Sequence, residues 1–271
     1  MRAIAEGAAR IVMRVYEGGD MNVEYKIGDD PVTRADKEAN AYIVENLQKE
    51  FPDVPIVAEE SEIASYGAYM TSPRAFFVDP LDGTRDFVAR TNEFAVMLGL
   101  AEAGRAVAGV VVEPVTGNVY FGAEGCGAFC ISRAGAERPI SVSSATTFAE
   151  ATVTVSRSHR SASVDADLAR LAAKELRHYG SAGLKSIRVA EGVFDAYVHT
   201  STSGYRWDAC APEAIVRAAG GIYTDSKGAP MNYRSKNLEN STGVLAANPV
   251  LHKEALVRLW PSTHTGAPKI A

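Results

Sequence analysis

Residues 76–84 read FFVDPLDGT, an apolar run that ends in an acidic turn. Apolar residues followed by Pro and Gly are typical of a buried strand and the turn after it. Pro80 fixes the backbone between Asp79 and Asp82, so both carboxylates, with the Leu81 carbonyl between them, can face one point. The stretch therefore predicts a strand that delivers two acids to a single site.

The two residues that follow favour a phosphate at the same place. Gly83 permits close approach of the backbone, and Thr84 opens a short predicted helix whose free amides can hold an anion. Asp, Pro and Gly are also ordinary turn formers, so a β-turn with two solvated acids remains an alternative for the pattern taken alone.

Further strands and helices are predicted on both sides of this stretch. The expected strands are PIVAEE (55–60), FAVMLGL (94–100), AVAGVVVEP (106–114), NVYFGAEG (118–125), PISVSS (139–144), ATVTVSRS (151–158) and FDAYVHT (194–200), with a hairpin at IYTDSKG (222–228). The expected helices are 1–19, 33–51, 163–176, a segment from the 180–183 turn to 191, 207–219 and 249–259. Strands dominate the first part and alternate with helices in the second, which predicts an α+β fold with halves 1–140 and 141–271.

The composition restricts the partners. The chain has 271 residues, 46% of them apolar, and a formal net charge of −5. This net negative charge argues against a general nucleic-acid or anionic-membrane binder. A small anionic substrate remains possible, because bound metal ions can make the local charge of a site positive. No apolar run reaches the roughly 18 residues of a membrane span, and residues 1–19 lack the features of a signal peptide.

Cysteine and histidine usage favours a reducing compartment and disfavours zinc. Three cysteines, Cys126, Cys130 and Cys210, are too few for a disulfide framework, which predicts a cytoplasmic protein. Cys126 and Cys130 lie in GCGAFC, which we interpret as a glycine-rich turn with two small apolar residues; a redox pair is the alternative. The five histidines are scattered along the chain.

Other acids stand at the ends of predicted elements. Glu59 and Glu60 end a strand, whereas Asp36 and Asp208 stand at helix starts. Each has a simpler explanation, a solvated strand edge for the glutamates and a helix cap for the aspartates. Together they form an all-oxygen set without His or Cys, which favours a hard cation, Mg²⁺ before Zn²⁺.

Four stretches in this order resemble the inositol monophosphatase superfamily of lithium-sensitive, Mg²⁺-dependent phosphatases. They are DPVTRAD (30–36), VAEES (57–61), VDPLDGTRDF (78–87) and WDACAPEAIVRAAGG (207–221). The resemblance spans about residues 30–247 and implies a layered αβαβα sandwich. It also implies two Mg²⁺ ions, with a third held more loosely through Glu59.

The resemblance assigns a role to each matching position. Glu59, Asp79 and the Leu81 carbonyl would hold one metal, and Asp79, Asp82 and Asp208 the second. Glu60 would contact the metal ligands rather than the metal itself. Thr84, hydrogen-bonded to Asp36, would activate the attacking water, and the amides of Gly83 and Thr84 would hold the scissile phosphate.

The second half resembles the 3′(2′),5′-bisphosphate nucleotidase branch, which removes the 3′-phosphate of adenosine 3′,5′-bisphosphate, a by-product of sulfur metabolism. The resemblance lies in WDACAPE (207–213), SRSH (156–159) and GSAGLK (180–185). It would place Ser156, His159, Ser181, Lys185 and Asp208 on the nucleotide. Taken alone, a histidine such as His159 is more often an ordinary hydrogen-bonded residue, and a lysine such as Lys185 is more often a solvated surface group.

Two other functions stay open. An inositol or sugar monophosphatase would share the metal site, but VHTSTSGYR (198–206) lacks the acid that grips sugar hydroxyls in such enzymes. A non-catalytic nucleotide sensor would have no need of a water-activating pair. The expected partner is a small phosphoester; the sequence leaves the oligomeric state open, and the resemblance makes a homodimer one expectation.

Overall fold

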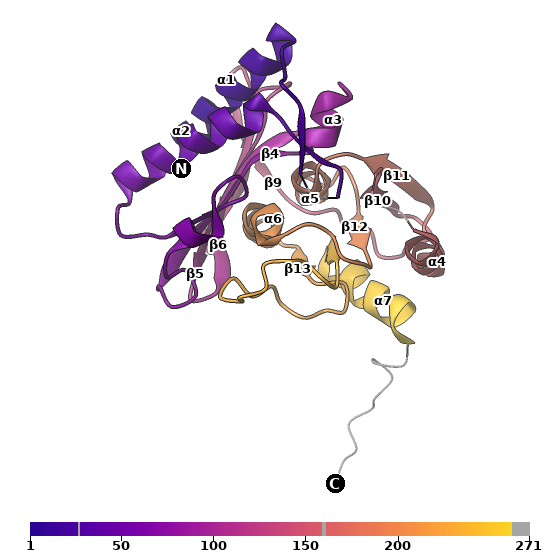
Figure 1. The fold of residues 1–271 in the computed structure, drawn as a ribbon. Coiled ribbons are helices and arrows are strands. Elements are labelled where there is room, and N and C mark those ends of the chain that lie inside the picture. The colour runs from indigo at the N-terminus through magenta and orange to yellow at the C-terminus, as the bar shows by residue number, and fades with distance from the viewer. Residues whose placement is uncertain (27, 159–160, 262–271) are drawn as a thin grey trace.

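The chain folds into five alternating layers (Figure 1). The computed structural model describes residues 1–26, 28–158 and 161–261. A pair of helices covers one face of a seven-stranded sheet, a second pair lies between that sheet and a five-stranded sheet, and a third pair covers the outer face. The pairs are, in that order, α1 (Arg2–Gly18) with α2 (Arg34–Glu50), α5 (Ala182–Ala190) with α6 (Arg206–Ala218), and α4 (Ala162–Leu171) with α7 (Pro249–Leu259). The predicted αβαβα sandwich is confirmed.

The large sheet comes from the first half of the chain and the small sheet from the second. The large sheet has the order β3 (Ile56–Ala58), β4 (Arg74–Asp82), β5 (Ala95–Glu102), β6 (Arg105–Glu113), β7 (Asn118–Ala123), β8 (Gly127–Ile131), β9 (Glu137–Ile140). The small sheet has the order β11 (Glu175–Tyr179), β10 (Thr152–Ser156), β12 (Ala196–His199), β14 (Val244–Ala247), β13 (Ile222–Thr224). A hairpin of β1 (Glu24–Lys26) and β2 (Asp30–Val32), a 3₁₀ turn (Ile63–Tyr66) and α3 (Thr84–Val88) complete the described elements. A domain boundary at residue 140 stays a proposal.

Strand β4 shows why the layers form. Phe76 and Val78 pack with α1 and α2, while Phe77 faces the middle helices. Side chains of a strand alternate between its faces, so an unbroken apolar run is buried on both. The strand that carries the acidic turn is therefore fixed between two layers of helices.

Helix α6 lies directly against the large sheet. A Cβ atom added at Gly109 of β6 would lie 2.3 Å from the carbonyl oxygen of Ala211 in α6. Only a residue without a side chain allows this approach. The contact fixes the start of α6, where Asp208 stands, relative to β4.

The predicted helix 163–176 was too long. α4 ends at Leu171, where Ala172 adopts a left-handed conformation with φ 47°, and Leu176 lies in the edge strand β11. β11 exposes three of its five residues, so it lacks the apolar alternation by which a half-buried strand is recognised.

Three further predictions were wrong in part. Of the expected strand 139–144, only Pro139 and Ile140 lie in a strand, at the end of β9. GCGAFC contains strand β8, on which Cys130 is buried, and only its start is a turn; both cysteines are free. The expected hairpin at 222–228 has its turn, but β13 pairs with β14, which begins at Val244. Among the described residues, no helix is long and apolar enough to cross a membrane.

Candidate active site

A β-bulge brings Asp79 and Asp82 to the same side of β4. Asp79 pairs with Met97 and Asp82 with Ala95, so three steps along β4 oppose two steps along β5. In a regular strand, residues three apart point to opposite faces, and the extra residue of a bulge cancels this difference. The Leu81 amide donates to Asp79 Oδ1 at 2.9 Å, which holds the irregular turn.

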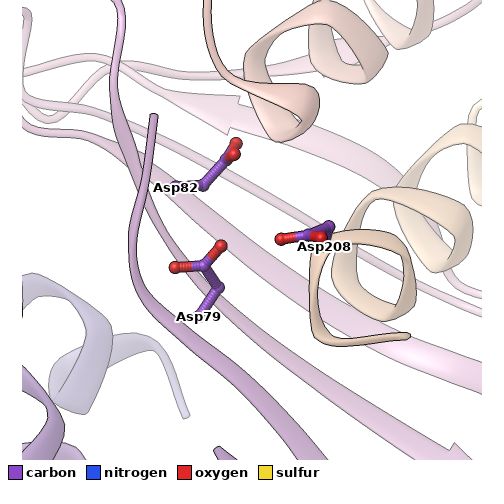
Figure 2. A group of neighbouring side chains, drawn as sticks. All are labelled: Asp79, Asp82 and Asp208. Carbon is purple, nitrogen blue, oxygen red and sulfur yellow. The ribbon is translucent and has the colours of Figure 1, made fainter. Parts of the chain in front are cut away.

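Helix α6 supplies a third carboxylate to this point. Asp208 is the third residue of the helix and accepts a hydrogen bond from the amide of Tyr205, as in a capping box. One oxygen from each of Asp79, Asp82 and Asp208 lies within 4.8 Å of the others. Figure 2 shows the three side chains directed into one space between the strand and the helix.

The pKa values of two of these aspartates are raised because the carboxylates are buried close together. Burial, together with the negative charges of Glu59, Asp208 and Asp82, raises the pKa of Asp79 well above its ordinary value. Burial and Asp82 raise the pKa of Asp208 to about 7. A divalent cation among the three oxygens would relieve both the desolvation and the repulsion. The all-oxygen donor set fits Mg²⁺.

Glu59 and Glu60 face the same region from the end of β3 and share one cation. The Lys26 ammonium lies 3.1 Å from Glu59 Oε1 and also contacts Glu60. Burial raises the pKa of Glu59 to about 8, although Lys26 opposes the shift. Glu59 lines the pocket that the three aspartates line, which fits a further metal contact.

Thr84 and Asp36 are hydrogen-bonded. The Thr84 hydroxyl lies 3.0 Å from Asp36 Oδ1 and 3.0 Å from the Leu81 carbonyl oxygen, and it has one proton for the two acceptors. Thr33 caps α2, and its amide and hydroxyl donate to Asp36 Oδ2 at 2.8 and 2.6 Å. Burial raises the pKa of Asp36 to about 6 despite these bonds, so the carboxylate remains mainly ionised at neutral pH.

The carboxylates open into a pocket of about 280 Å³. Its charged lining residues are mostly acids: Asp30, Glu59, Asp79, Asp82, Asp86 and Asp208 against Arg85, Arg157 and Lys185. Without metal ions this lining would repel a phosphate ester. The pocket therefore fits an anionic substrate together with divalent cations.

Most of the predicted substrate residues also line this pocket. Gly83, Thr84, Ser156, Ser181 and Lys185 all line the pocket, whereas His159 lies outside the described residues. The amides of the turn at Ser181 are already used. Those of Ala182 and Gly183 donate to Asp82 at 3.1 and 2.6 Å, and the Ser181 hydroxyl donates to the same carboxylate.

Lys185 is not a surface residue. Its side chain is buried, and its ammonium donates to the Ser181 carbonyl oxygen at 2.8 Å. Burial lowers its pKa to about 8, so it is mostly protonated at neutral pH. A buried cation on the pocket wall suits a phosphate that is held rather than cleaved.

Several pocket residues escaped the sequence analysis. Arg85 and Asp86 follow directly after the DGT motif, and Arg157 belongs to SRSH, so motif position was the available signal for all three. Lys26, which does not line the pocket but contacts Glu59 and Glu60 beside it, lies in a polar hairpin without any motif. Tyr205 stacks on Trp207 with ring centroids 4.6 Å apart, a contact that only the fold reveals.

The sequence is similar to one family over almost its whole length. A family model described as the inositol monophosphatase family matches residues 1–264. The chain is 34% identical to the 3′(2′),5′-bisphosphate nucleotidase CysQ of Escherichia coli K12, over 85% of this chain and 91% of that protein. It is 32% identical to human 3′(2′),5′-bisphosphate nucleotidase 1, over 90% of this chain and 88% of that protein.

Solved structures show the same fold. The extragenic suppressor protein suhB of Bartonella henselae aligns with a TM-score of 0.82 and 29% identity over 97% of both chains. The IMPase of Thermotoga maritima aligns with a TM-score of 0.78 and 28% identity, over 95% of this chain and 94% of that chain.

Proposed function

Because the chain belongs to the inositol monophosphatase family, we propose that it is a Mg²⁺-dependent phosphomonoesterase that hydrolyses the 3′-phosphate of adenosine 3′,5′-bisphosphate to AMP and phosphate. The observation that carries this proposal is the convergence of Asp79, Asp82 and Asp208 in a pocket that also contains Thr84. Buried acids that repel one another are costly unless they serve a bound cation.

The metal ligands are proposed from the donor set. Glu59, Asp79 and the Leu81 carbonyl would hold one ion, and Asp79, Asp82 and Asp208 a second. When bound, Mg²⁺ supplies positive charge to the phosphate oxygens and lowers the pKa of water. Inhibition by Li⁺ and a third, looser ion are further parts of the proposal.

Thr84 and Asp36 would handle the proton of the attacking water. When the Thr84 hydroxyl donates to Asp36, its oxygen lone pairs are free to accept a hydrogen bond from water. The Asp36 carboxylate can then take up a proton through the hydroxyl. Its pKa of about 6 leaves it ionised at neutral pH and makes it a better proton acceptor than an ordinary aspartate. The Gly83 and Thr84 amides would orient the scissile phosphate.

Three observations favour a nucleoside bisphosphate. The curated relatives reported above carry this activity in their names. Lys185 offers a buried positive charge for a second phosphate. Tyr205, 40% exposed on the pocket wall, offers an aromatic face on which a base can stack.

An inositol or sugar monophosphatase is the alternative, which the likeness to the IMPase of Thermotoga maritima favours. Phosphate release from adenosine 3′,5′-bisphosphate and from myo-inositol 1-phosphate, each with Mg²⁺ and with EDTA, separates the two. We expect Mg²⁺-dependent release with kcat/KM at least about tenfold higher for the nucleotide, equivalent to about 1.4 kcal/mol. A preference for the inositol ester would contradict the nucleotidase assignment.

A non-catalytic nucleotide sensor is the alternative from another class. The Thr84–Asp36 hydrogen bond argues against it, because binding alone has no use for a proton acceptor beside the phosphate. Absence of phosphate release from both esters, with retained nucleotide binding, would favour the sensor. A cytoplasmic location is proposed on the cysteine usage, and a homodimer on the resemblance to the family.

A further inference from the structure

Three acids hold the turn that opens α5. Asp82 accepts hydrogen bonds from the amides of Ala182 and Gly183, as described above. Glu93, in the loop before β5, accepts the amide of Gly180 at 2.6 Å. Asp86 of α3 packs against the same glycine, where an added Cβ would lie 2.3 Å from Asp86 Oδ2. The turn 180–183 is thus held on two sides by carboxylates.

Arg157, just after β10, neutralises two of these acids. Its Nη1 atom lies 2.5 Å from Asp86 Oδ1 and 2.7 Å from Glu93 Oε2. Both carboxylates are largely buried, with side chains 9% and 18% exposed. Without the guanidinium, two close negative charges would repel each other in a poorly hydrated place.

The cluster is unsuited to receive a phosphate itself. One guanidinium faces two carboxylates, so its charge is already offset at the pocket wall. The contacts of the cluster lead to the turn instead. Glu93 reaches Gly180, and the next residue is Ser181, which has a strained positive φ of 54° and precedes Lys185 by one helical turn.

We propose that Arg157 is a positioning residue: by neutralising Asp86 and Glu93 it keeps Glu93 on the Gly180 amide and so holds Ser181 and Lys185 in place for the substrate. The choice of substrate rests on the proposed function, but the positioning of the turn does not. A strained turn is maintained only where its surroundings fix it, and the ion cluster supplies that restraint.

The kinetic test uses Arg157→Met with adenosine 3′,5′-bisphosphate and Mg²⁺. We expect KM to rise about tenfold with kcat changed less than about threefold, because binding through the turn is weakened while the water-activating pair is intact. Arg157→Lys, which keeps the charge, should hold KM within about threefold of the wild-type value. Arg74→Met removes an arginine from an exposed pair with Glu102 and serves as the matched control, with unchanged kinetics.

A second substitution distinguishes charge neutralisation from packing. In the double variant Arg157→Met/Glu93→Gln the excess negative charge is gone, while the carbonyl oxygen of the introduced side-chain amide can still accept the Gly180 amide proton. KM should therefore return towards the wild-type value. If adding Glu93→Gln fails to restore KM, or if Arg157→Met alone leaves KM unchanged, the proposal is wrong.

Amide hydrogen exchange of residues 180–184 without substrate tests the same claim independently of catalysis. The exchange rate should rise about tenfold or more in Arg157→Met and return towards the wild-type rate in the double variant. It should stay at the wild-type rate in Arg74→Met. Unaltered exchange in Arg157→Met would overturn the proposal. If the wild-type protein does not hydrolyse the nucleotide, the proposed function fails, and the exchange data still decide the role of Arg157.

Discussion

Thr84 contributes one hydroxyl to the site, and its proton is shared between Asp36 and the Leu81 carbonyl. Thr84→Val keeps the shape of the side chain and removes the hydroxyl. We expect kcat for phosphate release to fall about 100-fold or more, because the proton relay is lost, with little change in Tm. Thr84→Ser is the control and should retain most of the activity. Unchanged release by Thr84→Val would exclude this residue from water activation.

Asp79 is predicted to cost stability in the absence of metal. Its folded-state pKa is raised, so the stability it contributes when protonated is lost as the pH rises and the carboxylate ionises. In EDTA at pH 8, Asp79→Asn should therefore raise Tm by about 2 °C or more, as measured by calorimetry. With Mg²⁺ the wild-type protein should instead have the higher Tm, because only the wild-type site binds the metal. A lower Tm for the variant in EDTA would show that the acid is structural.

Some of the site follows from sequence, and some requires the fold. The approach of Asp79, Asp82 and Asp208 was predicted, and the structure places their oxygens together, while their roles stay proposals. The turn 180–183 was expected to place Ser181 and Lys185 on the substrate, and both line the pocket, yet the amides of Ala182 and Gly183 are bonded to Asp82. A sequence shows which donors a turn contains but not which acceptor from another strand reaches them.

The packing of α6 on the large sheet links stability to the site. In Gly109→Ala the new Cβ would clash with the backbone of Ala211, and backbone cannot move away as a flexible side chain can. We expect a loss of about 1–3 kcal/mol in the free energy of unfolding, measured with urea. A fall of at least about tenfold in kcat/KM should accompany it, because Asp208 moves with the helix.

Gly18→Ala provides the control for this variant. Gly18 ends α1, and an added Cβ would have no heavy atom within 4 Å. Its stability and activity should stay close to the wild-type values. Full activity and stability in Gly109→Ala would show that the position of α6 does not depend on this contact.

Helix α7 carries a pH-dependent contact with the small sheet. His252 is buried and lies 2.8 Å from the Thr224 hydroxyl, and burial lowers its pKa from 6.5 to about 4. At pH values between about 4 and 6.5, His252 binds a proton in the unfolded chain but not in the folded protein. The stability that this residue contributes is therefore fully present above pH 6.5 and is lost as the pH falls. The loss at pH 5 should reach about 1–2 kcal/mol.

Urea unfolding of His252→Gln at pH 7 and pH 5 measures this contribution. Glutamine can keep a hydrogen bond to Thr224 but does not titrate. The difference in stability between the two pH values should therefore be smaller in the variant than in the wild-type protein. Equal differences would show that His252 contributes no such linkage.

Elements with strong periodicity were predicted well, whereas the strands β11 and β14 were not. The capping box of Thr33 and Asp36 and the apolar face of α1 marked their helices correctly. The first two residues of β11, Glu175 and Leu176, were assigned to the predicted helix 163–176, and the rest of the strand was missed because its mostly exposed residues lack an apolar period. β14 was missed because its partner β13 lies across a long loop, and only the fold pairs the two.

At the scale of the whole molecule, the site depends on several layers at once. Asp79 and Asp82 come from β4 of the large sheet, Asp208 from α6 of the middle layer, and Ser156 from β10 of the small sheet. Figure 1 shows these three elements in the fold. The hydrophobic cores between the layers hold these elements against the mutual repulsion of the carboxylates. Stability of the fold and geometry of the site are therefore coupled.

The central claim is that these acids hold divalent metal. Crystals soaked in Mn²⁺, which replaces Mg²⁺ and gives an anomalous signal, test it directly. We predict anomalous peaks at about 2.0–2.5 Å from carboxylate oxygens of Asp79, Asp82 and Asp208. A soaked crystal with no peak at these oxygens, or with peaks only at other acids, would contradict the account.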